Sequence, residues 1–104
     1  MMFNTGTSLL DAVVLAIVSK ESDGTYGYKI TQDVRSVLDV SESALYRVLR
    51  RLQTGGLLET FDKEFNGRNR RYYKTTELGR TEVETYRKDW TAYVDKINGI
   101  LGAS

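Results

Sequence analysis

The stretch SESALYRVLRRLQTGG, residues 41–56, decides how this chain folds. Its apolar residues recur at the i, i+3, i+4, i+7 spacing of one helix face: Leu45, Val48, Leu49 and Leu52. Ser41 is a typical N-cap residue, and Gly55-Gly56 is typical of a helix end. The stretch therefore predicts a helix from Ser41 to about Thr54 that packs on a core through one side.

The opposite side of this helix is polar and basic: Glu42, Ser43, Tyr46, Arg47, Arg50 and Arg51. A recognition helix enters the major groove of DNA with its N-terminal residues on the base edges. We predict that role for Ser43, Ala44 and Arg47, since an arginine can bind guanine through two hydrogen bonds. Tyr46 and Arg50 lie further round the helix and are predicted to contact phosphates. The alternative is an ordinary polar helix surface.

Two helices are predicted before this one. Residues 9–20 are apolar on most sides, which indicates contacts on several faces, and Thr7 or Ser8 is the expected cap. The second helix begins after Thr25 as its cap and has apolar residues at spacings of three and four. Two short helices followed by a third that ends in glycine are typical of a helix-turn-helix.

A β-hairpin follows the third helix. Leu58 to Phe65 reads as a strand with Phe61 and Phe65 on one side, Asn66-Gly67 as a tight turn, and Arg70 to Thr75 as the return strand. Basic side chains gather at and after the turn: Arg68, Arg70 and Arg71. A winged helix uses such a loop on phosphates or in the minor groove. The alternative is a basic edge that resists aggregation.

The last predicted helix starts after the cap Thr76 and runs to about Ile100. Its apolar residues form a heptad-like stripe that we predict to be a homodimer interface: Val83, Tyr86, Trp90, Tyr93, Val94, Ile97 and Ile100. A domain this small has little other surface on which to bury them. The alternative, compatible with the first, is packing on the helix at residues 9–20.

The predicted fold class is therefore mainly α with a small β-hairpin. Residues 1–76 form a winged helix-turn-helix DNA-binding domain, and residues 77–104 form a long C-terminal dimerisation helix, in one compact unit. A dimer of this kind binds an inverted-repeat operator in double-stranded DNA, with half-sites about 34–36 Å apart.

Composition excludes several classes of protein. The 104 residues include no cysteine and no histidine, which removes disulfides, Cys/His zinc sites and the commonest general base. No P-loop and no close carboxylate pair in an apolar setting is recognisable, so we predict no enzyme, no catalytic residue, no cofactor and no metal. The apolar run at residues 12–18 falls short of the ~20 residues of a membrane span, and no basic residue precedes Lys20. We therefore expect a cytoplasmic protein without a membrane partner.

Charge is unevenly distributed along the chain, whose formal net charge is only +1. Residues 41–76 carry eight basic and four acidic side chains, whereas residues 1–40 carry three and five, and residues 77–104 carry four and five. The middle third is therefore net positive, which favours a local phosphate-facing surface.

Several stretches, in this order, resemble the PadR family of bacterial transcriptional regulators: TYGYKI (25–30), SALYRVLRRL (43–52), GLL (56–58), RRYYKTT (70–76) and GR (79–80). The resemblance covers about residues 9–101. The short length, the single C-terminal helix and the segment WTAYVDKI (90–97) are similar to the smaller subfamily that includes multidrug-sensing repressors. Where the family's wing often begins with Gly-Gly, this chain has Asn66-Gly67-Arg68-Asn69.

This resemblance implies a homodimeric repressor that a small planar aromatic effector relieves. Trp90 would stack on that ligand at the dimer centre, with Leu10 and Val14 as further lining; plain dimer packing is the alternative for Trp90. The alternative function is a winged-helix protein-interaction module that binds no DNA. Five arginines argue against this alternative, because such a module would have a less basic wing and recognition helix: Arg47, Arg50, Arg68, Arg70 and Arg71.

Overall fold

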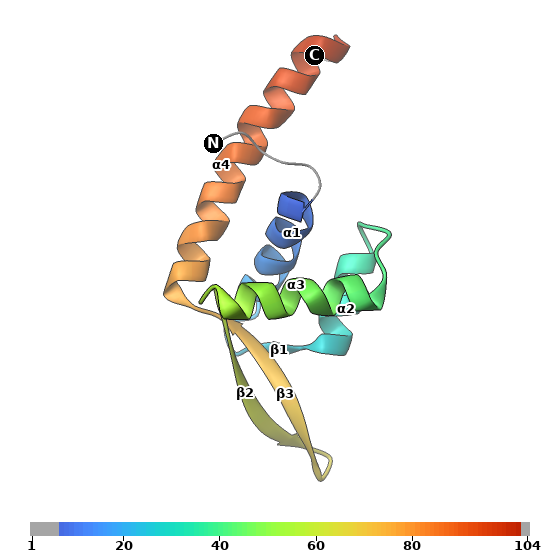
Figure 1. Ribbon diagram of the computed structural model, residues 1–104, viewed down its shortest axis with the longest axis vertical. Helices are drawn as coiled ribbons and strands as arrows, with labels where there is room; N and C mark the ends of the chain where they lie inside the picture. The colour runs from blue at the N-terminus through green and yellow to red at the C-terminus, as the bar shows by residue number, and fades with distance from the viewer. Residues whose placement is uncertain (1–6, 103–104) are drawn as a thin grey trace.

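The computed structural model describes residues 7–102, and that part of the chain folds into four helices and a three-stranded antiparallel sheet. In chain order the elements are α1 (Thr7–Ser19), β1 (Thr25–Tyr26), α2 (Gly27–Arg35), α3 (Glu42–Thr54), β2 (Leu58–Phe65), β3 (Arg68–Thr75) and α4 (Glu77–Leu101). The molecule is elongated, 55 × 27 × 21 Å, with the β2–β3 hairpin at one end and the C-terminal half of α4 at the other (Figure 1). The predicted mainly helical winged helix-turn-helix with a long last helix is confirmed.

The core lies where the first three helices meet the base of the hairpin. Its side chains come from all three helices and from both long strands: Val14, Leu15, Val18, Ile30, Val34, Leu45, Val48, Leu49, Leu52, Leu58 and Tyr73. α1 packs against α2, α3 and α4. The sequence prediction that α1 makes contacts on several faces is therefore confirmed. Fully burying a large aliphatic side chain contributes about 1.5–3 kcal/mol, so these contacts stabilise the fold.

Two predicted caps are confirmed. The Ala44 N–H donates to Ser41 Oγ (3.1 Å), and the Gly79 N–H donates to Thr76 Oγ1 (3.0 Å). Both hydroxyl groups satisfy amides that the helix itself leaves without a partner.

Thr25 was expected to cap α2, and this prediction is wrong. Thr25 lies in β1, where it pairs with Tyr73 of β3, and α2 begins at Gly27 after Tyr26 as the N-cap residue. The strand pairing, with a partner far along the chain, overrides the local capping preference of threonine. The start of the first helix also differs, because α1 already begins at Thr7 and so includes both residues expected before it.

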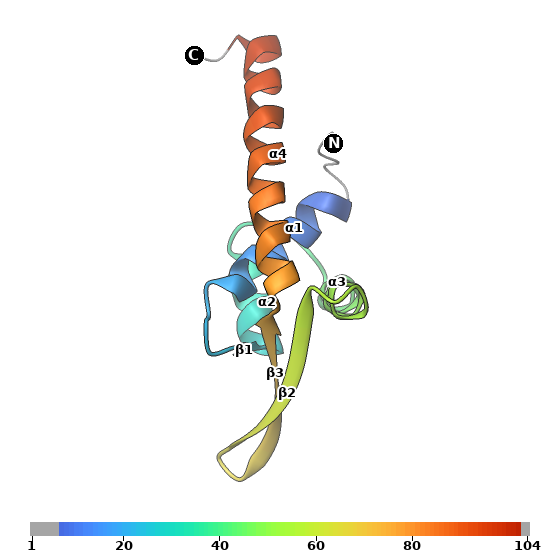
Figure 2. The ribbon, with the colours of Figure 1, turned by 90° about the vertical axis from the view of Figure 1, so that its left-hand side faces the viewer.

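The hairpin is built as its turn predicts. Asn66 and Gly67 both have positive φ, 52° and 78°, which is the backbone of a two-residue type I′ turn. Pairing runs from Leu58↔Thr75 at the base to Phe65↔Arg68 at the tip, so β3 starts two residues earlier than expected. The hairpin, called the wing below, projects away from the helices (Figure 2).

α4 leaves the sheet at a tight contact. A Cβ on Gly79 would lie 2.2 Å from the carbonyl oxygen of Leu57, so only glycine lets the first turn of α4 approach the α3–β2 connection this closely. The first half of α4 then runs along α1, and the second half continues beyond the rest of the molecule (Figures 1 and 2).

Candidate functional site

The outward face of α3 presents most of the residues that the sequence singles out. Ser43, Tyr46, Arg47 and Arg50 are exposed, and Ala44 is half-buried. Within the described residues, neither Arg47 nor Arg50 forms an ion pair. Their guanidinium groups therefore face solvent without a carboxylate partner to displace.

Arg51 departs from this face. Its Nη2 donates to Asp11 Oδ1 (2.5 Å) and its Nε to Asp11 Oδ2 (3.4 Å). These hydrogen bonds raise the pKa of Arg51 above its ordinary value. The ion pair joins the end of α3 to α1. The helical pattern places Arg51 on the polar side of α3, but it does not reveal a partner 40 residues away.

The wing holds its arginines in different ways. Arg70 is half-buried, with its guanidinium 3.9 Å from the ring centre of Phe65 and 4.1 Å from that of Tyr26. Arg71 lies on the other face of the sheet, 3.9 Å from Asp62 in an exposed and therefore weak ion pair. Arg68 is exposed at the tip. Cation–π contacts thus fix the orientation of Arg70, whereas Arg68 and Arg71 are held loosely.

The two adjacent tyrosines of β3, Tyr72 and Tyr73, pack against other side chains of the same chain. Tyr72 stacks on Phe61 (5.5 Å between ring centres) and meets Tyr26 edge-on (5.8 Å). Tyr73 is part of the core, and burial raises its pKa above the ordinary value.

A hollow of about 790 Å³ opens between the start of α2, α3 and the wing. Its lining, here called the helix–wing hollow, is Tyr26, Gly27, Tyr28, Tyr46, Phe65, Arg70, Arg71 and Tyr73. It brings together three of the predicted DNA-contacting residues, from α3 and from the wing. The N-cap residue Tyr26 makes no side-chain hydrogen bond to the first turn of α2, and the N-terminus of a helix generally attracts anions.

Sequence reasoning missed two members of this hollow. Tyr28 is 68% exposed, and its hydroxyl accepts a hydrogen bond from Gln32 Nε2 (3.1 Å). Gly27 leaves room for the Tyr46 side chain, because a Cβ there would lie 2.5 Å from the Tyr46 hydroxyl and would force that ring to move.

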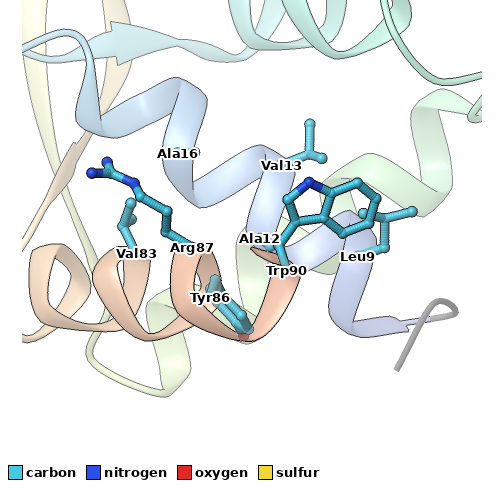
Figure 3. A pocket seen from close by; sticks show the side chains of 8 residues that line it. All are labelled: Leu9, Ala12, Val13, Ala16, Val83, Tyr86, Arg87 and Trp90. Carbon is cyan, nitrogen blue, oxygen red and sulfur yellow. The ribbon is translucent and has the colours of Figure 1, made fainter. Parts of the chain in front are cut away.

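A second, apolar pocket of about 310 Å³ lies between α1 and α4. Leu9, Ala12, Val13 and Ala16 line it from α1, and Val83, Tyr86, Arg87 and Trp90 line it from α4. Figure 3 shows the indole of Trp90 beside Leu9 and Val13, with Arg87 and Val83 towards the Ala16 end. This α1–α4 pocket contains Trp90, the residue that the family resemblance marks for ligand stacking.

The two other expected lining residues are elsewhere. Val14 is fully buried in the core, and Leu10 packs against that core. Successive residues of a helix are about 100° apart, so the pocket face of α1 follows positions 9, 12, 13 and 16, and position 14 points to the other side. The structure therefore places Val13, and not Val14, in the pocket.

The predicted dimer stripe divides into two parts. Val83 and Tyr86 pack against the core of the same chain. Tyr93, Val94 and Ile97 are half-buried, and Trp90 and Ile100 are exposed. The helix thus packs on α1 through its first half and leaves apolar side chains on its second half.

No helix among residues 7–102 has the length and apolar character needed to cross a membrane. The same described residues contain no group of three or more acidic side chains placed to hold a metal ion.

Comparison with known proteins identifies the family. The model of the Transcriptional regulator PadR-like family matches residues 14–85, more than half of the chain. A crystal structure of a Streptococcus mutans protein is 35% identical, with a TM-score of 0.86 over 98% of this chain and 94% of that one. A PadR-like transcriptional regulator from Bacillus cereus is 29% identical, with a TM-score of 0.80 over 89% and 91%.

Bacillus subtilis PadR, solved in complex with operator DNA, shares the fold at 19% identity and a TM-score of 0.65, over 75% of this chain and 46% of that one. The family consists of transcriptional regulators, which confirms the prediction that this chain is not an enzyme. The chain belongs to the PadR-like family of transcriptional regulators.

Proposed function

We propose that this chain is a sequence-specific DNA-binding repressor that acts in the cytoplasm as a homodimer on an inverted-repeat operator. One observation carries the proposal: Tyr46 from the outward face of α3, the start of α2 and the basic wing meet around the helix–wing hollow. The operator complex of the Bacillus subtilis relative, which has the same fold, supports it.

The residues divide by what they contact. Ser43, Ala44 and Arg47 lie in the first half of α3 and read base edges, because that end of a recognition helix enters the groove. Tyr46 and Arg50 hold phosphates, as do the amides at the start of α2 beside Tyr28. Arg68, Arg70 and Arg71 place the wing on the backbone or in the minor groove.

Residues 1–76 act as the DNA-binding unit, and residues 77–104 supply the dimerisation helix. The exposure of Ile100 (80%) and Leu101 (74%) at the far end of α4 supports this division, since a second copy of the helix would cover them. We propose Val83, Tyr86, Trp90, Tyr93, Val94, Ile97 and Ile100 as the interface, with Val83 and Tyr86 also packed within their own chain.

The α1–α4 pocket is the proposed effector site. Its apolar lining and a 43% exposed tryptophan suit a planar aromatic compound, and its volume is near the lower end of the ~300–1,000 Å³ of small-molecule sites. Such an effector shifts the repressor only through its difference in affinity for the DNA-bound and the free form.

Fluorescence anisotropy with the duplex upstream of the protein's own gene tests DNA recognition. We expect tight binding that resists scrambled competitor and weakens steeply between two salt concentrations. Lys96→Ala, which removes one charge from the far half of α4, serves as the matched control and should bind normally. Equal, weak binding to both sequences contradicts the proposal and favours a protein-interaction module, which a pull-down would then address.

Sedimentation at micromolar concentration tests the dimer. Ile97→Glu together with Ile100→Glu should give a folded monomer, whereas Lys96→Glu should remain a dimer. An unchanged sedimentation coefficient in the double variant would place the interface elsewhere.

A further inference from the structure

The ion pair between Asp11 and Arg51 lies where three elements with different tasks meet. α1 packs against both α3 and α4 (Figures 1 and 2). Asp11 and Arg51 join α1 to the last turn of α3. We propose that this pair is a positioning device that couples the α1–α4 pocket to the recognition helix. The inference rests on the proposed DNA-binding function.

α1 has two separate contact surfaces. Leu9, Ala12, Val13 and Ala16 face α4 and line the pocket, while Asp11 projects from a different side of the helix, where Arg51 reaches it. A helix of this length moves as one body, so a shift of α1 against α4 also shifts the Asp11 carboxylate.

The pair is built to keep its geometry. The Asp11 side chain is only 13% exposed, and both of its carboxylate oxygens accept hydrogen bonds from Arg51. A two-point contact between a guanidinium and a carboxylate fixes direction as well as distance. The Arg51 side chain is 48% exposed, but separation would leave the Asp11 carboxylate, which is mostly buried, without its cation; this favours movement of the two residues together.

Tyr86 of α4 completes the junction. It lines the α1–α4 pocket, and its hydroxyl interacts electrostatically with both Asp11 and Arg51. Burial, followed by the carboxylates of Asp11 and Glu82, raises the pKa of Tyr86, while Arg51 lowers it. A ligand in the α1–α4 pocket, or a change in the dimer, would therefore act on α1 and α4 close to the ion pair that joins α1 to α3.

The consequence concerns the DNA-contacting face. Arg51 lies on the same helix as Arg47 and Arg50, one turn after Arg47, so a shift of α3 at Arg51 also moves the backbone that carries these two arginines. Binding at one site and binding at the other then influence each other equally, as linkage requires. DNA bound at α3 should change the surroundings of Trp90, although Trp90 is not part of the helix–wing hollow.

Trp90 provides the measurement, because it is the only tryptophan of the chain. We would titrate the full-length protein with the duplex upstream of its gene, following the anisotropy of the labelled duplex and the emission of Trp90 in parallel. The wild-type emission should change in proportion to the bound fraction. In Asp11→Asn and in Arg51→Gln, binding should stay within a few-fold of wild type while the emission change falls by at least half.

Two further variants separate coupling from stability. The double variant Asp11→Asn/Arg51→Gln should lose no more of the emission change than either single variant, because both remove one shared interaction. Asp33→Asn, which disrupts an ion pair with Lys29 on α2, is the matched control and should keep the full change. Should Asp11→Asn fail to fold, Arg51→Lys retains the charge, loses the two-point contact and should show a reduced change.

The outcomes are distinct. An emission change of wild-type size in all variants, or bound DNA with no emission change in the wild type, overturns the coupling and leaves the DNA-binding function standing. No binding of any duplex in the anisotropy channel refutes the proposed function, and the coupling falls with it.

Discussion

α3 and the wing both carry arginines that we propose for DNA contact, but the structure holds the two elements in different ways. α3 is anchored by four buried side chains, Leu45, Val48, Leu49 and Leu52. The outer half of the wing, from Phe61 to Asn69, is exposed and is ordered by stacking of aromatic rings and Arg70. A rigid anchor suits base reading, which needs fixed geometry, whereas an adaptable arm suits phosphates, which recur along any duplex.

The largest expected effect tests this difference in anchoring. Leu49→Ala should lower the free energy of unfolding by about 2–5 kcal/mol, because it leaves a cavity in the core. Phe65→Ala, which removes a half-exposed ring from the wing, should cost about 1 kcal/mol or less. Urea denaturation of both variants measures the two values, and equal losses would mean that the wing is anchored as firmly as the helix.

Arg47→Ala tests whether this arginine contacts a base or a phosphate. Its loss should reduce discrimination between operator and scrambled duplex by about 1–3 kcal/mol, because a base contact is lost. Anisotropy titrations with both duplexes give the ratio. A uniform loss on both sequences would instead assign Arg47 to a phosphate.

Arg70 is the corresponding test on the wing. Arg70→Ala should weaken binding to every sequence and reduce the slope of log K against log salt by about 1. Arg70→Lys should restore the slope but not the full affinity, because lysine keeps the charge and loses the planar stacking between Phe65 and Tyr26. A slope that stays at the wild-type value in Arg70→Ala would leave this arginine with a purely structural role.

The smallest expected effect lies where helix and wing meet. Gly27→Ala forces the Tyr46 hydroxyl to move, and losing one phosphate hydrogen bond should reduce DNA affinity by about 0.5–1.5 kcal/mol. Stability should hardly suffer, because alanine favours a helix by about 1 kcal/mol over glycine. Tyr46→Phe, which removes only the hydroxyl, is the matched variant and should bind as weakly. Normal DNA binding by both variants would show that the Tyr46 hydroxyl does not contact the DNA.

Prediction from the sequence succeeded where the signal is local. The stripe of α3, the caps Ser41 and Thr76 and the Asn66-Gly67 turn each depend on residues within a few positions, and the structure has all of them. It failed at Thr25, whose capping preference is weaker than the pairing of its backbone with Tyr73.

The candidate site shows the same limit. The sequence alone determined the four helices, the hairpin, the family resemblance, and which arginines lie on the polar side of α3 and on the wing. Only the tertiary structure decided that Arg51 binds Asp11, that Arg70 lies between Tyr26 and Phe65, and that Val13 rather than Val14 lines the α1–α4 pocket. The physical reason is that caps, helix faces and tight turns are set by neighbours along the chain. Ion pairs, ring stacking and the rotation of a helix about its axis are set by partners that only folding brings together.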